Sequence, residues 1–333
     1  MSFLYVYERA ATIGVLNNCI VVESNNLKRT LPIEGVESII IFGDAVLTPN
    51  CVRNLMERDI NLTWLSSRGK FYGRLESTRS VNIYRQRRQF ACGEDETFCL
   101  ALSMRIISAK IRNQITILRR YQRHRAVSVQ DSIEAMSRLL PVVERVQSKD
   151  ELMGHEGIAA RHYYKGLSLL LGPEVAFQGR NRQPPRDPFN SLLSFAYTLL
   201  MYDIYTAVVN RGLNPYAGFL HSIRRGHPAL CSDLMEEWRA VLADSLALYV
   251  ISRGIIKPDS FEVAEPEGGV YLNTEAAKIY IAEYEKKVRS RSNYIPYVDY
   301  TVSFRRGMEM QCHRLAKAVE EGDPFIYQPV VIR

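Results

Sequence analysis

Short runs of β-branched and aromatic residues make the first 78 positions of the 333-residue chain strand-rich. Three of these runs are predicted strands: residues 3–7, 20–23 and 36–42. A closing hairpin is predicted over residues 60–75, and one short helix over residues 49–59. We therefore expect two small sheets packed on each other, as in a β-sandwich-like domain.

Beyond this region the hydrophobic period becomes that of helices. Over residues 96–120 an apolar stripe recurs every three or four positions, formed by Leu100, Met104, Ile107, Ile111, Ile115 and Leu118. Further helices are predicted over residues 131–147, 149–171, 187–210, 232–252, 274–289 and 294–321. The helix over 187–210 is mostly apolar, so we expect it to be buried in the centre of the helical region. Residues 172–187 and 258–269 show no period and are predicted loops.

These patterns predict an α+β multidomain protein with a small N-terminal β-sandwich-like domain and a larger all-α C-terminal domain. The predicted boundaries are residues 1–78 for the β domain, 79–95 for a basic linker with the start of a helix, and 96–333 for the helical domain. With 47% hydrophobic and 24% charged residues, the composition is that of ordinary globular proteins and argues against a disordered or low-complexity chain.

The positive charge of the chain is concentrated in one segment. The net charge is +7, yet residues 1–78 hold 8 basic and 8 acidic side chains, and residues 126–333 hold 24 and 25. Residues 79–125 hold 11 basic and 3 acidic side chains, a balance of +8. A concentrated basic segment indicates a polyanionic partner such as nucleic acid, although a solvated helix face has the same composition.

Cysteine use and hydropathy indicate the compartment. The six cysteines form no CxxC pair, so a structural zinc site is not expected, and a reducing compartment suits them. We expect no apolar run to reach the roughly 18 residues that span a bilayer, and we recognise no signal peptide at the start. We therefore expect a soluble, cytoplasmic protein with no membrane partner.

Three polar clusters are candidates for chemistry. Glu156 stands between Gly154 and Gly157 in a predicted helix, where it is either an acid favoured by the helix dipole or a metal ligand. His221 ends an aromatic turn and is either a structural histidine or a ligand. Asp233 and Glu236 are three residues apart and share a helix face, either as a solvated helix start or as a pair around a cation.

Taken together, the clusters offer two kinds of ligand, carboxylate oxygen and imidazole nitrogen. Mg²⁺ and Mn²⁺ prefer oxygen ligands, and one imidazole suits Mn²⁺ especially. Beside a basic segment, such a set suggests metal-assisted phosphodiester chemistry.

Six stretches, nearly from end to end, resemble the CRISPR-associated integrase, the universal DNA endonuclease of spacer acquisition. They are residues 36–43, 69–75, 156–161, 184–195, 218–221 and 233–237. This family commonly continues with Phe-Arg-Pro after the paired acids, whereas this chain has Trp238-Arg239-Ala240. We expect this departure to affect helix packing and not the ligands.

The resemblance implies a site and a reaction. Glu156, His221 and Glu236 match the metal ligands of the family, and Asp233 matches a second acidic position in the catalytic set. The implied cofactor is Mg²⁺ or Mn²⁺. In the implied reaction, the 3′-hydroxyl of a short DNA fragment attacks a phosphodiester at the edge of the CRISPR repeat, and water in its place gives nuclease activity.

Further residues are expected at the DNA. The predicted DNA contacts are Arg85, Arg87, Arg88, Arg182, Arg186, Asn190 and Arg224, with Asn190 expected near the metal together with Ser194 and Tyr197.

The resemblance also implies partners. These are double-stranded DNA, both protospacer and repeat, a second copy of the chain joined through the β domain, and the small ferredoxin-like second CRISPR-associated protein. Two alternatives remain open at this point: a structure-specific DNA nuclease, and a DNA-binding scaffold without catalytic activity.

Overall fold

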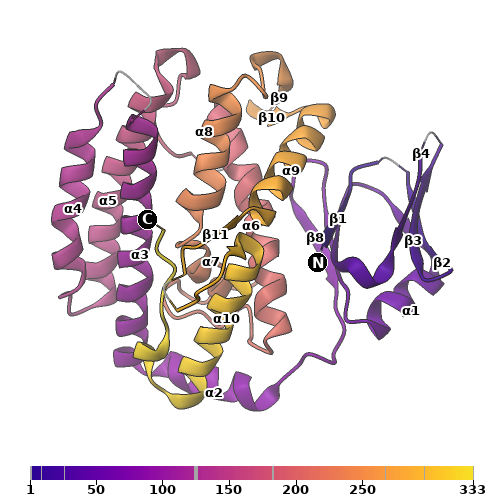
Figure 1. Cartoon of the computed structure of the whole chain (residues 1–333), viewed down its shortest axis with the longest axis horizontal. Coiled ribbons are helices and arrows are strands. Elements are labelled where there is room, and N and C mark those ends of the chain that lie inside the picture. The colour runs from indigo at the N-terminus through magenta and orange to yellow at the C-terminus, as the bar shows by residue number, and fades with distance from the viewer. Residues whose placement is uncertain are drawn as a thin grey trace. The chain divides into compact units, whose positions relative to one another are not determined.

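In the computed structural model, residues 2–8, 10–25, 27–123, 127–181, 184–266, 268–295 and 297–332 are described. The chain divides into two compact units. One comprises Met1–Val81 with Thr274–Ile281, and the other comprises Asn82–Asn273 with Ala282–Arg333. The first is mainly strand and the second mainly helix, as the predicted α+β class requires (Figure 1).

Two four-stranded sheets form the first unit. One sheet has the order β1-β5-β7-β8, with the bounds Ser2–Val6, Val36–Phe42, Asn61–Leu65 and Phe71–Leu75. The other has the order β4-β3-β2-β6, with the bounds Leu27–Pro32, Cys19–Ser24, Thr12–Leu16 and Val46–Leu47. The predicted hairpin is confirmed, because β7 and β8 pair antiparallel.

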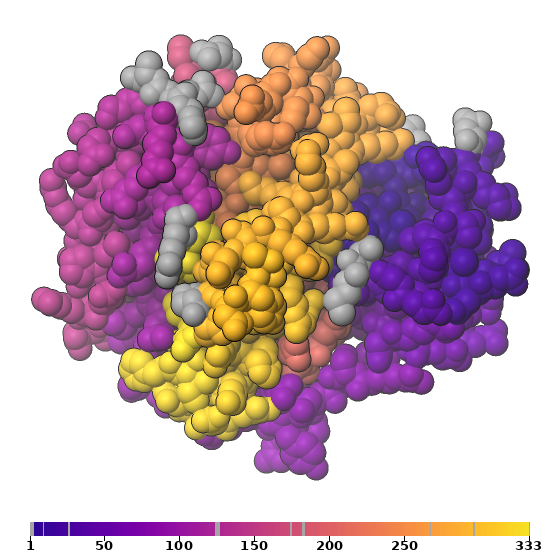
Figure 2. Space-filling model, viewed as in Figure 1, coloured from indigo at the N-terminus to yellow at the C-terminus, as the bar shows by residue number. Residues whose placement is uncertain are grey.

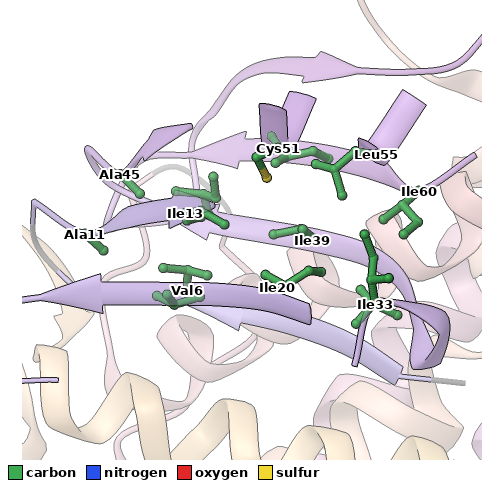
Figure 3. Close-up of a cluster of buried hydrophobic side chains, with 14 residues drawn as sticks. Val6, Ala11, Ile13, Ile20, Ile33, Ile39, Ala45, Cys51, Leu55 and Ile60 are labelled. Atoms are coloured by element: carbon green, nitrogen blue, oxygen red, sulfur yellow. The ribbon is translucent and has the colours of Figure 1, made fainter. Parts of the chain in front are cut away.

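The two sheets and α1 (Pro49–Glu57) share one hydrophobic core (Figure 3). Ile13 and Ile20 come from one sheet, Ile39 and Leu62 from the other, and Leu55 from α1. Each of these five side chains is fully buried. The predicted packing of two small sheets is therefore confirmed.

Three strands of this unit, β2, β4 and the two-residue β6, were not predicted. β4 forms one edge of its sheet and most of its residues are exposed, so it lacks the apolar alternation by which strands are recognised. β2 joins β3 through Asn17 and Asn18, which both have positive φ. Asparagine tolerates this conformation, and it suits a two-residue hairpin turn.

Within its described residues the second unit contains eight complete α-helices, the end of a ninth, several small strands and one π-helical segment, Arg239–Asp244. The helices α2 to α10 have the bounds Ile83–Glu94, Glu96–Gln122, Gln130–Val143, Lys149–Leu171, Pro188–Asn210, Ala229–Met235, Ser245–Ser252, Thr274–Arg289 and Phe304–Glu321. The helix α9 begins in the first unit and ends in the second. α10 and the chain after it are visible in yellow on the face shown in Figure 2.

Side-chain caps explain where the long helices begin. Asp95 accepts hydrogen bonds from the amides of Thr97 and Phe98 at the start of α3. Ser148 caps α5 and Asp187 caps α6 in the same way. The helices α3, α4 and α5 pack against one another, as Figure 1 shows.

The helix α6 is long and mostly apolar. By length and composition it could cross a membrane, which corrects the expectation that no apolar run is long enough. In the structure, however, 78% of its most apolar window is buried. It is therefore a core helix, in agreement with the predicted buried central helix.

Four predicted elements differ from the structure. Residues 232–252 are not one helix, because the π-helical segment separates α7 from α8. The predicted loop over 258–269 contains β9 (Phe261–Ala264) and the first residue of β10 (Gly269–Leu272). The last helix begins at Phe304 and not at 294, after the short strands β11 (Arg291–Ser292) and β12 (Val302–Ser303). The predicted linker contains a complete helix, α2.

Candidate active site

The helix α5 carries Glu156 into a cavity of about 350 Å³ in the helical unit. Glu156 is seven residues beyond the first residue of the helix, so the helix dipole, which acts within the first turn, does not explain it. A Cβ on Gly154 or Gly157 would meet no atom within 4 Å, so the space on either side of Glu156 along the helix is open.

His221 is held by Asp233, the first residue of the acidic pair on α7. The buried carboxylate of Asp233 accepts backbone hydrogen bonds from Phe219 at 2.6 Å, Leu220 at 3.0 Å and His221 at 2.8 Å. The same carboxylate lies 2.7 Å from His221 Nδ1. Nδ1 therefore carries a proton, and in the neutral ring Nε2 has the free lone pair.

The turn before His221 requires glycine at position 218. A Cβ there would lie 2.8 Å from Asp233 Oδ2 and 2.9 Å from the backbone of Ala229. Any larger residue would push the loop off the carboxylate that orients His221. Asp233 is completely buried and lies behind His221, so the geometry makes it a positioning residue.

Glu236 faces the cavity from the end of α7. Its Oε1 lies 3.8 Å from His221 Nε2 and 3.3 Å from Arg239 Nε, and its Oε2 lies 2.6 Å from Lys110 Nζ. Burial favours the neutral acid, but Arg239, Lys110 and His221 outweigh it and lower the pKa of Glu236 to about 2. The carboxylate is therefore ionised at neutral pH.

Lys110 on α3 links the two glutamates. Its Nζ lies 2.5 Å from Glu156 Oε1 as well as 2.6 Å from Glu236 Oε2. Burial disfavours its charge, yet the two carboxylates together raise its pKa above the ordinary lysine value. Among the described residues, no three His, Cys, Asp or Glu side chains form a metal-holding cluster as they stand.

The donor set nevertheless fits a hard divalent cation. Glu156, His221 and Glu236 all line the same cavity. Glu236 Oε2 is buried and accepts no hydrogen bond of acceptable geometry within the described structure. Two carboxylates and an imidazole nitrogen are ligands that Mg²⁺ and Mn²⁺ accept.

The π-helical segment brings two more residues to the cavity. Arg239 at its start stacks on the Tyr197 ring, 4.8 Å from the ring centroid. Asp244 at its end accepts hydrogen bonds from Tyr197 at 2.7 Å and Tyr163 at 2.8 Å. Burial raises the pKa of Asp244 to about 6. Segments of π-helix often occur at functional sites, because the extra residue redirects side chains.

Trp238, where the family pattern has another residue, is fully buried. Its ring packs edge-on against Tyr294 and Phe304, and its Nε1 donates to Gln311 at 2.7 Å. The departure thus concerns packing, as expected.

Asn190 lies behind the cavity wall and not in it. It accepts a hydrogen bond from Arg180 at 2.9 Å, and Arg180 also donates to Ser194 at 3.1 Å. Arg180 lines the cavity, and its guanidinium stacks on the Tyr197 ring, 5.2 Å from the ring centroid. Of the three residues expected near the metal, only Tyr197 lines the cavity.

Among the described residues, no predicted DNA-contact arginine lines the cavity. Arg85 pairs with Glu320 at 2.6 Å, and Arg88 donates to the carbonyl of Val319 at 3.2 Å, so both attach α2 to α10. Arg87, Arg186 and Arg224 are exposed. Arg182 lies outside the described residues.

Sequence reasoning missed Lys110, Arg180 and Arg239 as site residues. Arg239 had a usable signal, since it follows Glu236 by three residues and therefore shares its side of the chain. Lys110 and Arg180 are far from the acids in sequence and had no local signal.

Comparison with known proteins identifies the family of the chain. The family described as "CRISPR associated protein Cas1" matches residues 4–286. The "CRISPR-associated endonuclease Cas1" of Mycobacterium tuberculosis is 33% identical over 97% of this chain and 96% of its own length. The "CRISPR-associated endonuclease Cas1 3" of Thermus thermophilus is 35% identical over 91% of this chain and 88% of its own.

Solved structures share the fold. A Cas6-RT-Cas1–Cas2 complex chain matches with a TM-score of 0.84 and 25% identity over 98% of this chain and 36% of that one. A Cas1 protein from Thermotoga maritima gives 0.83 and 23% identity over 97% and 98% of the two chains. A casposase bound to an integration product gives 0.83 and 20% identity over 97% and 92%.

The family match covers most of the chain, and relatives with over 30% identity extend along nearly all of it. The chain belongs to the Cas1 family of CRISPR-associated proteins, which act in the adaptation module.

Proposed function

We propose that this chain is a divalent-metal-dependent DNA endonuclease and integrase that inserts short DNA fragments into the CRISPR repeat array. The observation that carries the proposal is the convergence of Glu156, His221 and Glu236 on one cavity. The endonuclease names of its close relatives support action on DNA. A casposase of the same fold is bound to an integration product, which is support at the level of the fold alone.

Each site residue has a role in this proposal. Glu156, His221 and Glu236 would hold Mg²⁺ or Mn²⁺, and Asp233 fixes the His221 ring with Nε2 toward Glu236. The bound ion would stabilise the negative charge that develops on the phosphate oxygens. Arg161, Arg180 and Arg239 line the same cavity and supply fixed positive charge for the phosphate of the DNA.

The proposed reaction exchanges one phosphoester for another. The 3′-oxygen of the fragment forms a bond to phosphorus, and the bond to the 3′-oxygen of the repeat strand breaks. The hydroxyl proton of the fragment is lost, and the released repeat strand gains one to end as a 3′-hydroxyl. No nucleotide cofactor is needed, because the number of ester bonds is unchanged. Attack by water in place of the hydroxyl would give hydrolysis at the same site.

We also propose the partners that the family resemblance implies. The match to a chain of a Cas6-RT-Cas1–Cas2 complex supports Cas2, the small ferredoxin-like protein, as a partner. Double-stranded protospacer and repeat DNA are the proposed substrates, and the cytoplasm is the proposed compartment. A homodimer through the β unit would give, in light scattering, twice the 38.2 kDa mass of the chain.

One assay distinguishes the proposal from its two alternatives. The chain, Cas2 and Mn²⁺ are incubated with a supercoiled repeat plasmid and labelled fragments that end in 3′-hydroxyl or 3′-deoxy. Joining of the 3′-hydroxyl fragment alone supports the integrase. Nicking without joining would indicate a structure-specific nuclease instead, and DNA binding without any metal-dependent product would indicate a scaffold.

The same assay tests the site. Glu156→Gln should lower joining at least about 100-fold, because it removes one charged ligand of a metal-dependent phosphoryl transfer. Asp150→Asn is the matched control, since Asp150 is an exposed acid in the first turn of the same helix. If both variants lose joining equally, or if neither loses it, the assignment of Glu156 is contradicted.

A further inference from the structure

Lys110 forms ion pairs with both glutamates of the proposed metal site. Its Nζ lies between the two glutamates, 2.5 Å from Glu156 Oε1 and 2.6 Å from Glu236 Oε2. Only 11% of its side chain is exposed, against 17% for Glu156 and 6% for Glu236. Two carboxylates this close, one buried and one half-buried, repel each other unless a cation lies between them. The chain supplies that cation itself.

We propose that Lys110 is an internal counter-ion, which holds the two carboxylates together when no divalent ion is bound and competes with that ion for them. This inference rests on the proposed function, since it takes Glu156 and Glu236 as the metal ligands. An ammonium and a divalent ion cannot share the position between the two oxygens, because like charges at such distances repel strongly. The metal would therefore bind by exchange, as the ammonium withdraws.

A second side chain on α3 provides a place for the displaced ammonium. Gln114 follows Lys110 by four residues, so the two lie on the same face of the helix. It lines the same cavity and is 3% exposed. Its Oε1 is buried and accepts no hydrogen bond from the described residues. A lysine ammonium can donate to this oxygen without leaving the cavity.

Arg239 does not have the same role. Its Nε approaches the other oxygen of Glu236, Oε1, at 3.3 Å. Its guanidinium is also held over the Tyr197 ring. It can therefore remain beside Glu236 when the position between the two glutamates is taken by a metal ion.

The test measures Mn²⁺ binding by isothermal titration calorimetry and the melting temperature with EDTA or Mn²⁺. The variants are Lys110→Met, the polar Lys110→Gln in case the first folds poorly, and Lys165→Met as control. Lys165 is exposed on α5 and is nine residues beyond Glu156, on the opposite face of that helix. Glu236→Gln is added to the wild type and to each lysine variant. Its effect on Mn²⁺ binding reports whether the calorimeter measures the ion at this site.

Removal of Lys110 should tighten Mn²⁺ binding about tenfold or more, since close charge pairs couple by at least about this factor. In EDTA the Lys110 variants should melt about 4 °C or more below the wild type, because the buried Glu236 and the half-buried Glu156 lose their partner. Mn²⁺ should raise their melting temperature more than that of the wild type. Lys165→Met should match the wild type.

Two results would overturn the inference. If the wild type binds Mn²⁺ and the Lys110 variants bind it equally or more weakly, Lys110 does not compete with the metal, although the proposed metal site stands. If neither the wild type nor the variants bind Mn²⁺, the inference and the proposed metal dependence fail together.

Discussion

At the scale of single residues, the pairing of Asp233 with His221 is the feature on which the site depends most. One buried carboxylate accepts three backbone hydrogen bonds and fixes one ring nitrogen of the histidine. The geometry thus gives Asp233 a different role from Glu236, although the two acids are only three residues apart. One orients a ligand, and the other faces the cavity.

Replacement of Asp233 by asparagine should damage both stability and activity. The new amide nitrogen cannot accept hydrogen bonds, so some of the backbone N–H groups that Asp233 binds lose their acceptor. This should lower the free energy of unfolding by about 3 kcal/mol. The His221 ring also loses the acceptor that fixes its tautomer, and joining should fall at least about 100-fold. Urea unfolding and the joining assay measure these effects. Unchanged joining at full stability would show that His221 needs no such orientation.

Asp244 gives the protein a pH dependence that can be measured. Burial raises its pKa from the ordinary value near 4 to about 6. The unfolded chain therefore releases this proton at lower pH than the folded protein does. Stability should fall as the pH rises from 4 through 6, by about 3 kcal/mol for a shift of about two units.

The variant Asp244→Asn lacks this titration, so its stability relative to the wild type should rise by about 3 kcal/mol between pH 4 and pH 7. Urea unfolding in EDTA at the two pH values provides the measurement, with Asp150→Asn as the control. Parallel pH profiles for wild type and Asp244→Asn would mean that Asp244 has an ordinary pKa.

At the scale of elements, α2 combines two kinds of arginine. Arg85 and Arg88 point to α10 and bind Glu320 and the carbonyl of Val319. Arg87, between them, is exposed and has no ion-pair partner among the described residues. A single basic run in the sequence therefore divides into structural arginines and one that is free to meet a phosphate.

Alanine at these positions should separate the two roles. Arg87→Ala should leave stability unchanged and lower the salt dependence of DNA binding by about one unit of slope, the loss of one phosphate contact. Arg85→Ala should instead lower the free energy of unfolding by about 1 kcal/mol, since a partly exposed ion pair is lost. Fluorescence anisotropy across a salt series and urea unfolding distinguish them. An equal change of slope in both variants would contradict this division.

The elements also show how far local patterns can predict structure. The helix over 149–171 follows from the local period and agrees with α5. Spacing made Glu156, Asp233 and Glu236 candidates, and only the family resemblance assigned them to a metal site. Glu156 and Glu236 line one cavity in the structure. The break between α7 and α8 does not follow, because the apolar pattern of residues 232–252 continues through the π-helical segment. Lys110 reaches Glu156 across 46 positions, and no local pattern encodes such a contact.

At the scale of the whole molecule, only part of the charge excess is available to attract DNA. The basic segment over 79–125 carries a balance of +8. Several of its side chains form hydrogen bonds or ion pairs with other parts of the protein: Arg85, Arg88, Arg105, Lys110 and Arg112. The salt dependence of DNA binding should therefore reflect fewer contacts from this segment than its charge suggests.

Anomalous diffraction from crystals grown with Mn²⁺ would show whether Glu156, His221 and Glu236 hold a divalent ion. We expect one anomalous peak within coordination distance of the two carboxylates and of His221 Nε2, with the Lys110 ammonium withdrawn from between the glutamates. A fully loaded crystal with its peak elsewhere, or with Lys110 still bridging Glu156 and Glu236, would show that these residues do not hold the ion in this way.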